Sequence, residues 1–380
     1  MFEEWYLNEV FSSKIRDAWK LTDYYLLRSI FNILDKSSII KLLKTPISIN
    51  TIMKVKKYPK RVFSSIQWIL ERLVLDGYVN KIKKRNEILY SITDKKMEYN
   101  LDEIKNKAYD LAPESISAFN MLKLITDNYT EYLSGSKNGI DIIFSSENID
   151  ITNEYYRNNL FYNVHNIVGA RILNWEINKK INPVILEVGG GLGGGTKELL
   201  KQRIESNENL DFNYYFTDIA NKMLRDTKKE VLRAIDNIER FEFQKLDFNK
   251  DLKSQGFDEN SFDIIWGVNA LHVANDLRFT LNEFYKVLKP RGILIICETV
   301  RPDGNKMIQQ EILLNTIDDY WNVKVDKEIR PCHGFMKWND WVKALKIVGF
   351  FDVKTIPDMV YLQGKYDNCY VSVIVGSKKN

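Results

Sequence analysis

The sequence contains a histidine and a glutamate, His272 and Glu298, whose types and positions suit proton removal. An apolar run at residues 262–269 leads into His272, and a second run at residues 292–298 ends in Glu298. Both runs have the composition of strands buried on two faces, so we expect their carboxyl ends to meet at one edge of a parallel sheet. An imidazole has a reference pKa of about 6.5, and a carboxylate beside it fixes its tautomer and stabilises the imidazolium. A lone histidine is more often structural, but this pair predicts a general base that needs no metal.

A glycine-rich loop follows an earlier buried run, residues 184–188, and opens a helical pattern. Glycine suits this place because the backbone turns sharply and a ligand can approach where no Cβ stands. Gly194 also meets the spacing of a nicotinamide fingerprint, so glycine spacing alone does not choose the nucleotide. The choice of nucleotide therefore depends on Glu187, the acid that precedes the first glycine. The glycines at alternate positions are Gly189, Gly191 and Gly193.

Acidic residues also end the next two expected strands. Asp218 closes the run at residues 212–217, and Asp247 with Phe248 closes the run that begins at residue 241. An acid at the end of the second strand can accept hydrogen bonds from both ribose hydroxyls of a nucleotide cofactor. One aspartate in a loop is common, but acids at three successive strand ends indicate a cofactor site.

The pattern Glu187-x-Gly189-x-Gly191-x-Gly193 resembles motif I of class I S-adenosylmethionine-dependent methyltransferases. Residues 160 to 300 resemble the methyltransferase domains of polyketide synthases, notably in Asn269-Ala-Leu-His272 and Ile296-Cys-Glu298. The resemblance implies S-adenosyl-L-methionine as cofactor and the histidine and glutamate as the catalytic pair, for either carbon or oxygen methylation. The Asp-Phe pair resembles residues that bind the adenine amino group and stack on its ring. The implied cofactor-binding residues are Glu187, Gly189, Gly191, Gly193, Asp218, Asp247, Phe248 and Asn269.

Alternating strands and helices from residue 181 onward predict an α/β fold, a Rossmann-like doubly wound and mostly parallel sheet. With 380 residues the chain is long enough for two domains. Residues 1–100 read as helices followed by a β-hairpin, a winged-helix-like outline, and residues 101–180 read as a helical linker or lid. The sequence therefore predicts a division into 1–100, 101–180 and 181–380.

The winged-helix outline has two interpretations. A basic run at residues 54–61 precedes the candidate recognition helix, residues 64–75, and could meet nucleic-acid phosphates. The helix itself is largely apolar, which leaves little of it to read bases. It resembles the dimerisation domain of small-molecule O-methyltransferases, so we favour a homodimer and regard nucleic-acid binding as the weaker alternative.

Three further residues are candidates for contact with the substrate. Tyr156 and Asn159 lie in a segment rich in aromatic and amide side chains, which is either a core-facing helix or a lid over the cofactor. His333 lies in a loop, where a structural role is the alternative. Residues 307–320 read as a helix that caps the substrate.

Composition excludes several classes of protein. An apolar fraction of 44% can build a large core, and a net charge of +4 is too small to signal nucleic-acid binding. Three widely spaced cysteines form no metal pattern and suggest a reducing compartment. We find no signal-peptide order and no membrane-spanning run, so we expect a cytoplasmic protein without a membrane partner.

The leading hypothesis is transfer of a methyl group to a hydroxyl or enol oxygen of a small, polyketide-like acceptor, free or carrier-bound. The preference for oxygen comes from the resemblance of the first hundred residues to O-methyltransferases. Methylation of the α-carbon of a β-ketoacyl thioester is the close alternative. A nucleic-acid methylase or DNA-binding regulator is less favoured, because the sequence after the fourth strand, Asn269-Ala-Leu-His272, lacks the Pro-Pro-aromatic signature of amino-group methylases.

Overall fold

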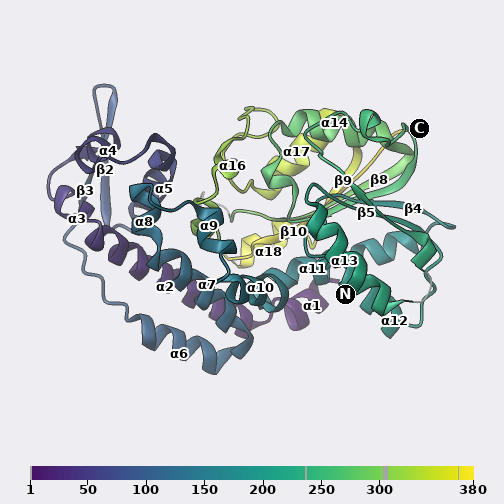
Figure 1. Cartoon of the computed structure of the whole chain (residues 1–380), viewed down its shortest axis with the longest axis horizontal. Coiled ribbons are helices and arrows are strands. Elements are labelled where there is room, and N and C mark those ends of the chain that lie inside the picture. Colours follow the sequence, from purple (N-terminus) through teal and green to yellow (C-terminus); the bar gives the residue numbers. More distant parts are fainter. Residues whose placement is uncertain (1, 236–237, 303–306, 367) are drawn as a thin grey trace. The chain divides into compact units, whose positions relative to one another are not determined.

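The computed structural model describes residues 2–235, 238–302, 307–366 and 368–380. The chain separates into two compact units (Figure 1). The first, here called the sheet unit, contains residues 1–12, 162–303 and 322–380. The second, the helical unit, contains residues 13–161 and 304–321. The three-part division expected from the sequence stays a prediction.

A seven-stranded sheet forms the centre of the sheet unit, in the order β6-β5-β4-β7-β8-β10-β9. The first five strands in this order are parallel, and β10 runs antiparallel to both of its neighbours. The order reverses between β4 and β7, which is the point where open α/β sheets bind ligands beyond the carboxyl ends of their strands. The predicted fold class is confirmed. The strands are β4 (Val184–Glu187), β5 (Asn213–Asp218), β6 (Phe241–Lys245), β7 (Phe262–Val268), β8 (Leu288–Thr299), β9 (Phe351–Ile356) and β10 (Val371–Ser377).

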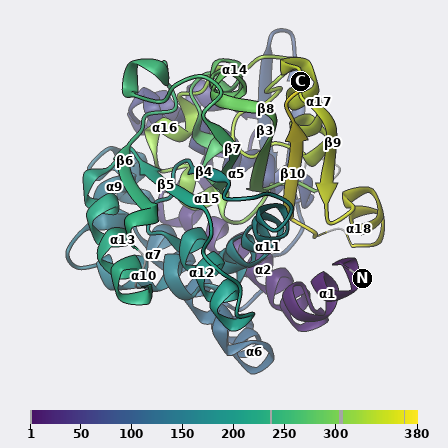
Figure 2. The ribbon, with the colours of Figure 1, turned by 90° about the vertical axis from the view of Figure 1, so that its right-hand side faces the viewer.

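Helices cover both faces of this sheet, as the apolar composition of its central strands requires. In Figures 1 and 2, α14 (Leu277–Val287) and α17 (Trp338–Val348) lie on one side and α12 (Gly194–Glu205) and α13 (Asn221–Ala234) on the other. Asp276 caps α14, because its carboxylate accepts a hydrogen bond from the backbone of Phe279 (3.1 Å). Further helices of this unit are α1 (Phe2–Trp5), α18 (Met359–Lys365) and α11 (Leu160–Ile177), which belongs to this unit from residue 162 onward.

The helical unit contains the predicted β-hairpin. Strands β2 (Val79–Lys84) and β3 (Glu87–Ile92) pair antiparallel, and β1 (Ile47–Ser48) adds a short third strand. Helix α5 (Phe63–Leu75) buries one face in the core of its own unit, as its helical spacing of apolar residues predicts. The winged-helix assignment and the dimer remain predictions. The other helices are α2 (Ser13–Lys36), α3 (Ile39–Leu42), α4 (Ile49–Lys56), α6 (Leu101–Leu111), α7 (Ile116–Asp127), α8 (Tyr129–Ser134), α9 (Gly139–Phe144) and α10 (Ile149–Asn158).

The single helix expected at residues 307–320 is wrong. The segment forms two short helices, α15 (Glu311–Leu314) and α16 (Asp318–Trp321). Glu311 accepts hydrogen bonds from the backbone of Ile308 (3.1 Å) and from the Tyr320 hydroxyl (2.7 Å), so buried polar contacts within the unit decide the shape of this segment. Across the part of the chain that the structure describes, no helix combines the length and apolarity needed to cross a membrane.

Candidate active site

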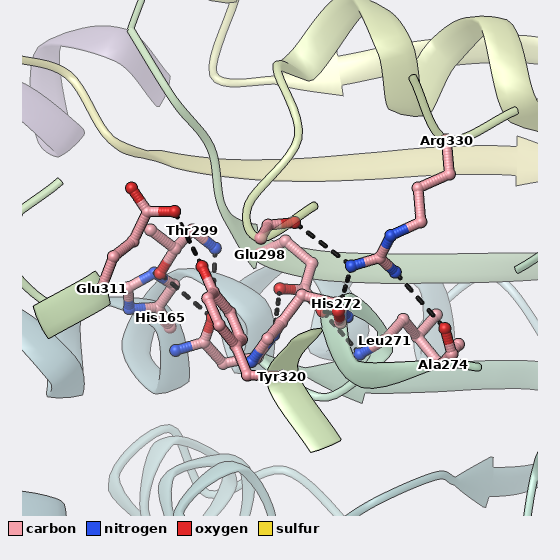
Figure 3. A network of polar contacts seen from close by, with 11 residues as sticks. His165, Leu271, His272, Ala274, Glu298, Thr299, Glu311, Tyr320 and Arg330 are labelled. Carbon is pink, nitrogen blue, oxygen red and sulfur yellow. Dashed lines mark hydrogen bonds and ion pairs between the residues drawn. The ribbon is translucent and has the colours of Figure 1, made fainter. Parts of the chain in front are cut away.

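His272 and Glu298 lie together at the carboxyl edge of the sheet (Figure 3). His272 is in a short 3-10 helix, Leu271–Val273, that follows β7, and Glu298 is near the end of β8. The imidazole Nδ1 is 3.0 Å from Glu298 Oε2. Because a carboxylate only accepts, Nδ1 carries the proton, and the neutral ring keeps Nε2 as its basic nitrogen. Both side chains are buried, with His272 7% exposed and Glu298 0%.

The backbone of the same turn holds the carboxylate. Glu298 Oε1 accepts hydrogen bonds from the backbone N–H of Leu271 (2.6 Å) and of His272 (3.2 Å). Hydrogen bonds of this kind offset the cost of burying the charged carboxylate. The glutamate therefore orients the imidazole and the turn that carries it.

A buried arginine secures this turn from the other side. Arg330 is fully buried, and its guanidinium donates to the carbonyl oxygens of His272 (2.5 Å), Ala274 (3.4 Å) and Gly334 (3.2 Å). This role of Arg330 is not predictable from the sequence, because an arginine in a loop carries no local signal of such a role. The loop also places Phe335 against the imidazole, with ring centroids 4.9 Å apart. His333 in this loop has an exposed side chain, and its contact with substrate stays a prediction.

The glycine loop has room for a ligand at one position. A Cβ built on Gly191 would meet nothing within 4 Å, and the φ of +55° there disfavours other residues. A Cβ on Gly189 would come within 2.8 Å of Ala270 Cβ, so this glycine is required by packing. Asp218, at the end of β5, accepts hydrogen bonds from the backbone of Gly191 (2.9 Å) and Ala220 (2.8 Å). The expected ribose-binding acid thus lies directly beside the open part of the loop.

Glu187 lies beneath this loop and is 1% exposed. It accepts hydrogen bonds from the hydroxyls of Thr196 and Tyr214, the latter at 2.8 Å. Burial raises the pKa of the Glu187 carboxyl to about 7, and these hydrogen bonds oppose the shift. The side chain therefore supports the loop from inside the sheet unit. A direct contact with cofactor stays a prediction.

The remaining residues expected to bind cofactor also lie near the carboxyl edge. Asp247 follows β6, and its carboxylate accepts from the backbone of Asn249 (3.1 Å) and pairs with Lys250 (3.1 Å). The Phe248 ring is 3.6 Å from a Cβ built on Gly189, so it borders the glycine loop. Asn269 follows β7 with a φ of +52° and accepts a hydrogen bond from the backbone of Thr299 (3.2 Å).

Tyr156 and Asn159 belong to the helical unit. Burial raises the pKa of the Tyr156 hydroxyl to about 12. Asn159 is 1% exposed, and its carbonyl oxygen accepts a hydrogen bond from the backbone of Phe161 (2.9 Å). Asn159 also lines a mainly apolar pocket of this unit together with Trp19 and Gln310. A role for either residue as a lid or substrate contact remains a prediction.

The strand order and the loop at its reversal point define a class I methyltransferase fold. Residues 186–294 match a family described as "Methyltransferase domain". Two solved structures share the fold over nearly the whole chain. One is CurJ carbon methyltransferase, with TM-score 0.77 and 19% identity, covering 97% of this chain and 93% of that one. The other is DszA carbon methyltransferase, with TM-score 0.76 and 23% identity, covering 95% and 90%.

Two curated relatives are fungal synthases. Fusarielin synthase FSL1 of Gibberella zeae is 27% identical over 251 residues, which are 65% of this chain and 9% of the synthase. Highly reducing polyketide synthase ctvA of Aspergillus terreus is 33% identical over 174 residues, 46% of this chain and 7% of that protein. The chain thus spans less than a tenth of the length of these two relatives. The match at residues 186–294 and the shared fold make this chain similar to class I methyltransferases.

Proposed function

We propose that this chain catalyses transfer of a methyl group from S-adenosyl-L-methionine to an acyl or enol acceptor, with His272 as the general base. The observation that carries the proposal is the 3.0 Å contact between His272 Nδ1 and Glu298 Oε2 at the carboxyl edge of the sheet. The contact leaves Nε2 as the nitrogen that can accept a proton. The open space at Gly191 supplies room for the donor in the same unit.

The residues present fit this cofactor. Gly191 would admit it to the loop, and Asp218 would accept hydrogen bonds from its ribose hydroxyls. Asp247 and Phe248 would bind the adenine, as amino-group acceptor and stacking partner. When bound, S-adenosyl-L-methionine supplies an electrophilic methyl group, which the deprotonated acceptor takes up as the carbon–sulfur bond breaks.

The chain's own part in the reaction is removal of the acceptor proton. That proton moves to His272 Nε2, and the proton on Nδ1 stays in its hydrogen bond to Glu298. The carboxylate offsets the positive charge that the ring then carries. Arg330 holds the carbonyl of His272 during this step, so the ring keeps its direction. The imidazolium returns its proton to solvent after product leaves.

We propose the α-carbon of a carrier-bound β-ketoacyl thioester as the acceptor. Removing the proton between two carbonyls gives an enolate whose carbon can attack a methyl group. Two solved structures with this fold are described as carbon methyltransferases, and one curated relative, ctvA, is described as a highly reducing polyketide synthase. They support proposing carbon as the acceptor in place of oxygen, which the resemblance of the first hundred residues favours. Oxygen methylation is the second candidate, because the same enolate also carries charge on oxygen.

The test combines binding with product analysis. Calorimetry with S-adenosylhomocysteine on the wild type, Asp218→Ala and His272→Ala separates the cofactor site from the base. We expect Asp218→Ala to weaken binding and His272→Ala to retain it while abolishing turnover. The acceptors are β-ketoacyl thioesters, phenols and stable enols, and NMR of the product locates the methyl group. Failure of the wild type to bind S-adenosylhomocysteine would overturn the proposal.

A further inference from the structure

A pocket lies inside the helical unit, among helices that come from distant parts of the sequence. Helix α7 packs against α2 and α10 (Figure 1), and α15 packs against α7 as well. The pocket encloses about 340 Å³ of space that no atom fills, part of it open to solvent. A small molecule, or one end of a longer molecule, can therefore enter it.

Apolar side chains form most of the wall of this pocket. Met121, Leu122 and Ile125 line it from α7. The rings of Trp19 and Phe161 also line it and meet edge to face, with centroids 5.2 Å apart. None of the described residues that line the pocket carries a charge. Because burial of an ion without a countercharge is costly, the pocket favours a neutral ligand.

Three buried amide side chains interrupt the apolar wall. Asn159, Gln309 and Gln310 are 1%, 3% and 9% exposed. The Asn159 carbonyl oxygen accepts a hydrogen bond from the backbone of Phe161 (2.9 Å), which identifies Nδ2 as the remaining donor. Within the described residues, no hydrogen bond is made by Asn159 Nδ2, by Gln309 Oε1 or by either polar atom of Gln310. Buried polar atoms are normally hydrogen-bonded, so these four atoms lack the partner that a ligand would supply.

Gln310 determines which ligand group fits. Its amide oxygen and nitrogen both lack a partner, so it presents one acceptor and one donor whichever way the carboxamide is turned. Asn159 adds a second donor, and Gln309 adds a second acceptor. A primary carboxamide matches this set, because its oxygen can accept two hydrogen bonds and its NH2 group can donate two.

We propose that this pocket binds a neutral carboxamide attached to a short apolar chain. The ligand oxygen accepts hydrogen bonds from Asn159 and Gln310, and the ligand NH2 group donates to Gln309 and Gln310. The apolar chain packs against the Met121 and Leu122 side chains. This inference goes beyond the proposed function, because the pocket belongs to the helical unit and takes no part in the methyl-transfer step.

Three probes of the same heavy-atom shape test the chemistry of the pocket. Butanamide carries the proposed donor and acceptor, 2-pentanone has a methyl group in place of the NH2 group, and butanoate carries a negative charge. Shifts of the Met121 and Leu122 methyl signals in carbon-13 NMR of the full chain measure binding at the pocket. We expect butanamide to bind about tenfold more tightly than 2-pentanone, because the ketone leaves two buried acceptors without a donor, and we expect no binding of butanoate. Equal affinity for the three probes, or no shift with butanamide, would overturn the inference.

A substitution at Gln310 separates recognition from general damage. Gln310→Met keeps an unbranched side chain of similar length but removes the donor and the acceptor. We expect it to weaken butanamide binding about tenfold and 2-pentanone binding much less, because Asn159 still donates to the ketone oxygen. Gln67→Met, in α5 and outside the pocket, is the control and should leave both affinities unchanged. An equal loss for both probes in Gln310→Met would overturn the inference.

The stability of the free protein gives a readout that needs no ligand. Buried polar atoms without hydrogen bonds destabilise a fold, so Gln310→Met should have a higher urea midpoint than the wild type. A lower midpoint would show that Gln310 has a hydrogen-bond partner in the free protein, which would overturn the inference. Circular dichroism before each titration checks that the variant is folded.

Discussion

Glu298 holds both the side chain and the backbone of His272. One carboxylate oxygen is 3.0 Å from the imidazole Nδ1 of His272. The other accepts a hydrogen bond from the backbone N–H of His272 (3.2 Å). The ring and the turn that carries it are thereby set by one buried carboxylate. A change of this group alters the tautomer of the base as well as its orientation.

Glu298→Gln should lower kcat by roughly 10²- to 10⁴-fold, the range seen when a base loses its orienting acid. The amide can donate to Nδ1 and so favour the Nε2–H tautomer, in which no basic nitrogen faces the acceptor. Assays stopped at several times and analysed for the methylated product measure kcat. Calorimetry should show unchanged S-adenosylhomocysteine affinity. A rate within threefold of the wild type would contradict the assigned role, where threefold is about 0.6 kcal/mol.

Arg330→Met should destabilise the fold by about 2 to 4 kcal/mol. The substitution leaves the carbonyls of His272, Ala274 and Gly334 without their donor, and unsatisfied buried acceptors carry such a cost. Urea unfolding followed by circular dichroism measures the change. Arg278→Met is the control, because the Arg278 ion pairs with Asp326 and Glu328 lie near the surface and should matter little.

Glu187→Gln should become more stable relative to the wild type as pH rises from 5 to 8. The folded-state pKa of Glu187, about 7, lies above its value in the unfolded chain, so the wild type loses stability as pH rises through that range. The relative change amounts to about 2 to 3 kcal/mol at most. Urea midpoints at several pH values measure it. A difference between the two proteins that does not vary with pH would contradict the raised pKa.

Gly191→Ala should weaken cofactor binding at least tenfold, because its Cβ would occupy the open space of the loop and the positive φ disfavours alanine. The expected loss of stability is about 1 kcal/mol. Gly364→Ala is the matched control, since a Cβ there also meets nothing within 4 Å but the glycine lies in α18 without a positive φ. Calorimetry with S-adenosylhomocysteine should detect no change for this control.

The full chain should form a homodimer through its first hundred residues. Multi-angle light scattering after gel filtration should give about twice the 44.7 kDa of one chain. Salt-dependent binding to duplex DNA, measured by fluorescence anisotropy, would instead favour the nucleic-acid interpretation of the basic run at residues 54–61. A monomer that does not bind DNA would contradict both interpretations of this region.

The sequence by itself determined the parallel sheet and the meeting of His272 with Glu298. Buried strands produce continuous apolar runs, and parallel strands bring their carboxyl ends to one edge, so local pattern and topology suffice for both. The same reasoning located the glycine loop and Asp218 beside it. The position of each of these residues follows from the strand at whose end it lies.

Only the tertiary structure decided which other side chains support these residues. Arg330 is 58 positions from the carbonyl of His272 that it binds, and His165 is 134 positions from Thr299. No periodicity encodes such partners, because the contact depends on how loops and helices pack after the sheet has formed. Glu187 shows the same limit. The sequence predicts its position before the loop, but only the packing shows that its carboxylate accepts hydrogen bonds from Thr196 and Tyr214. Burial at that place raises its pKa.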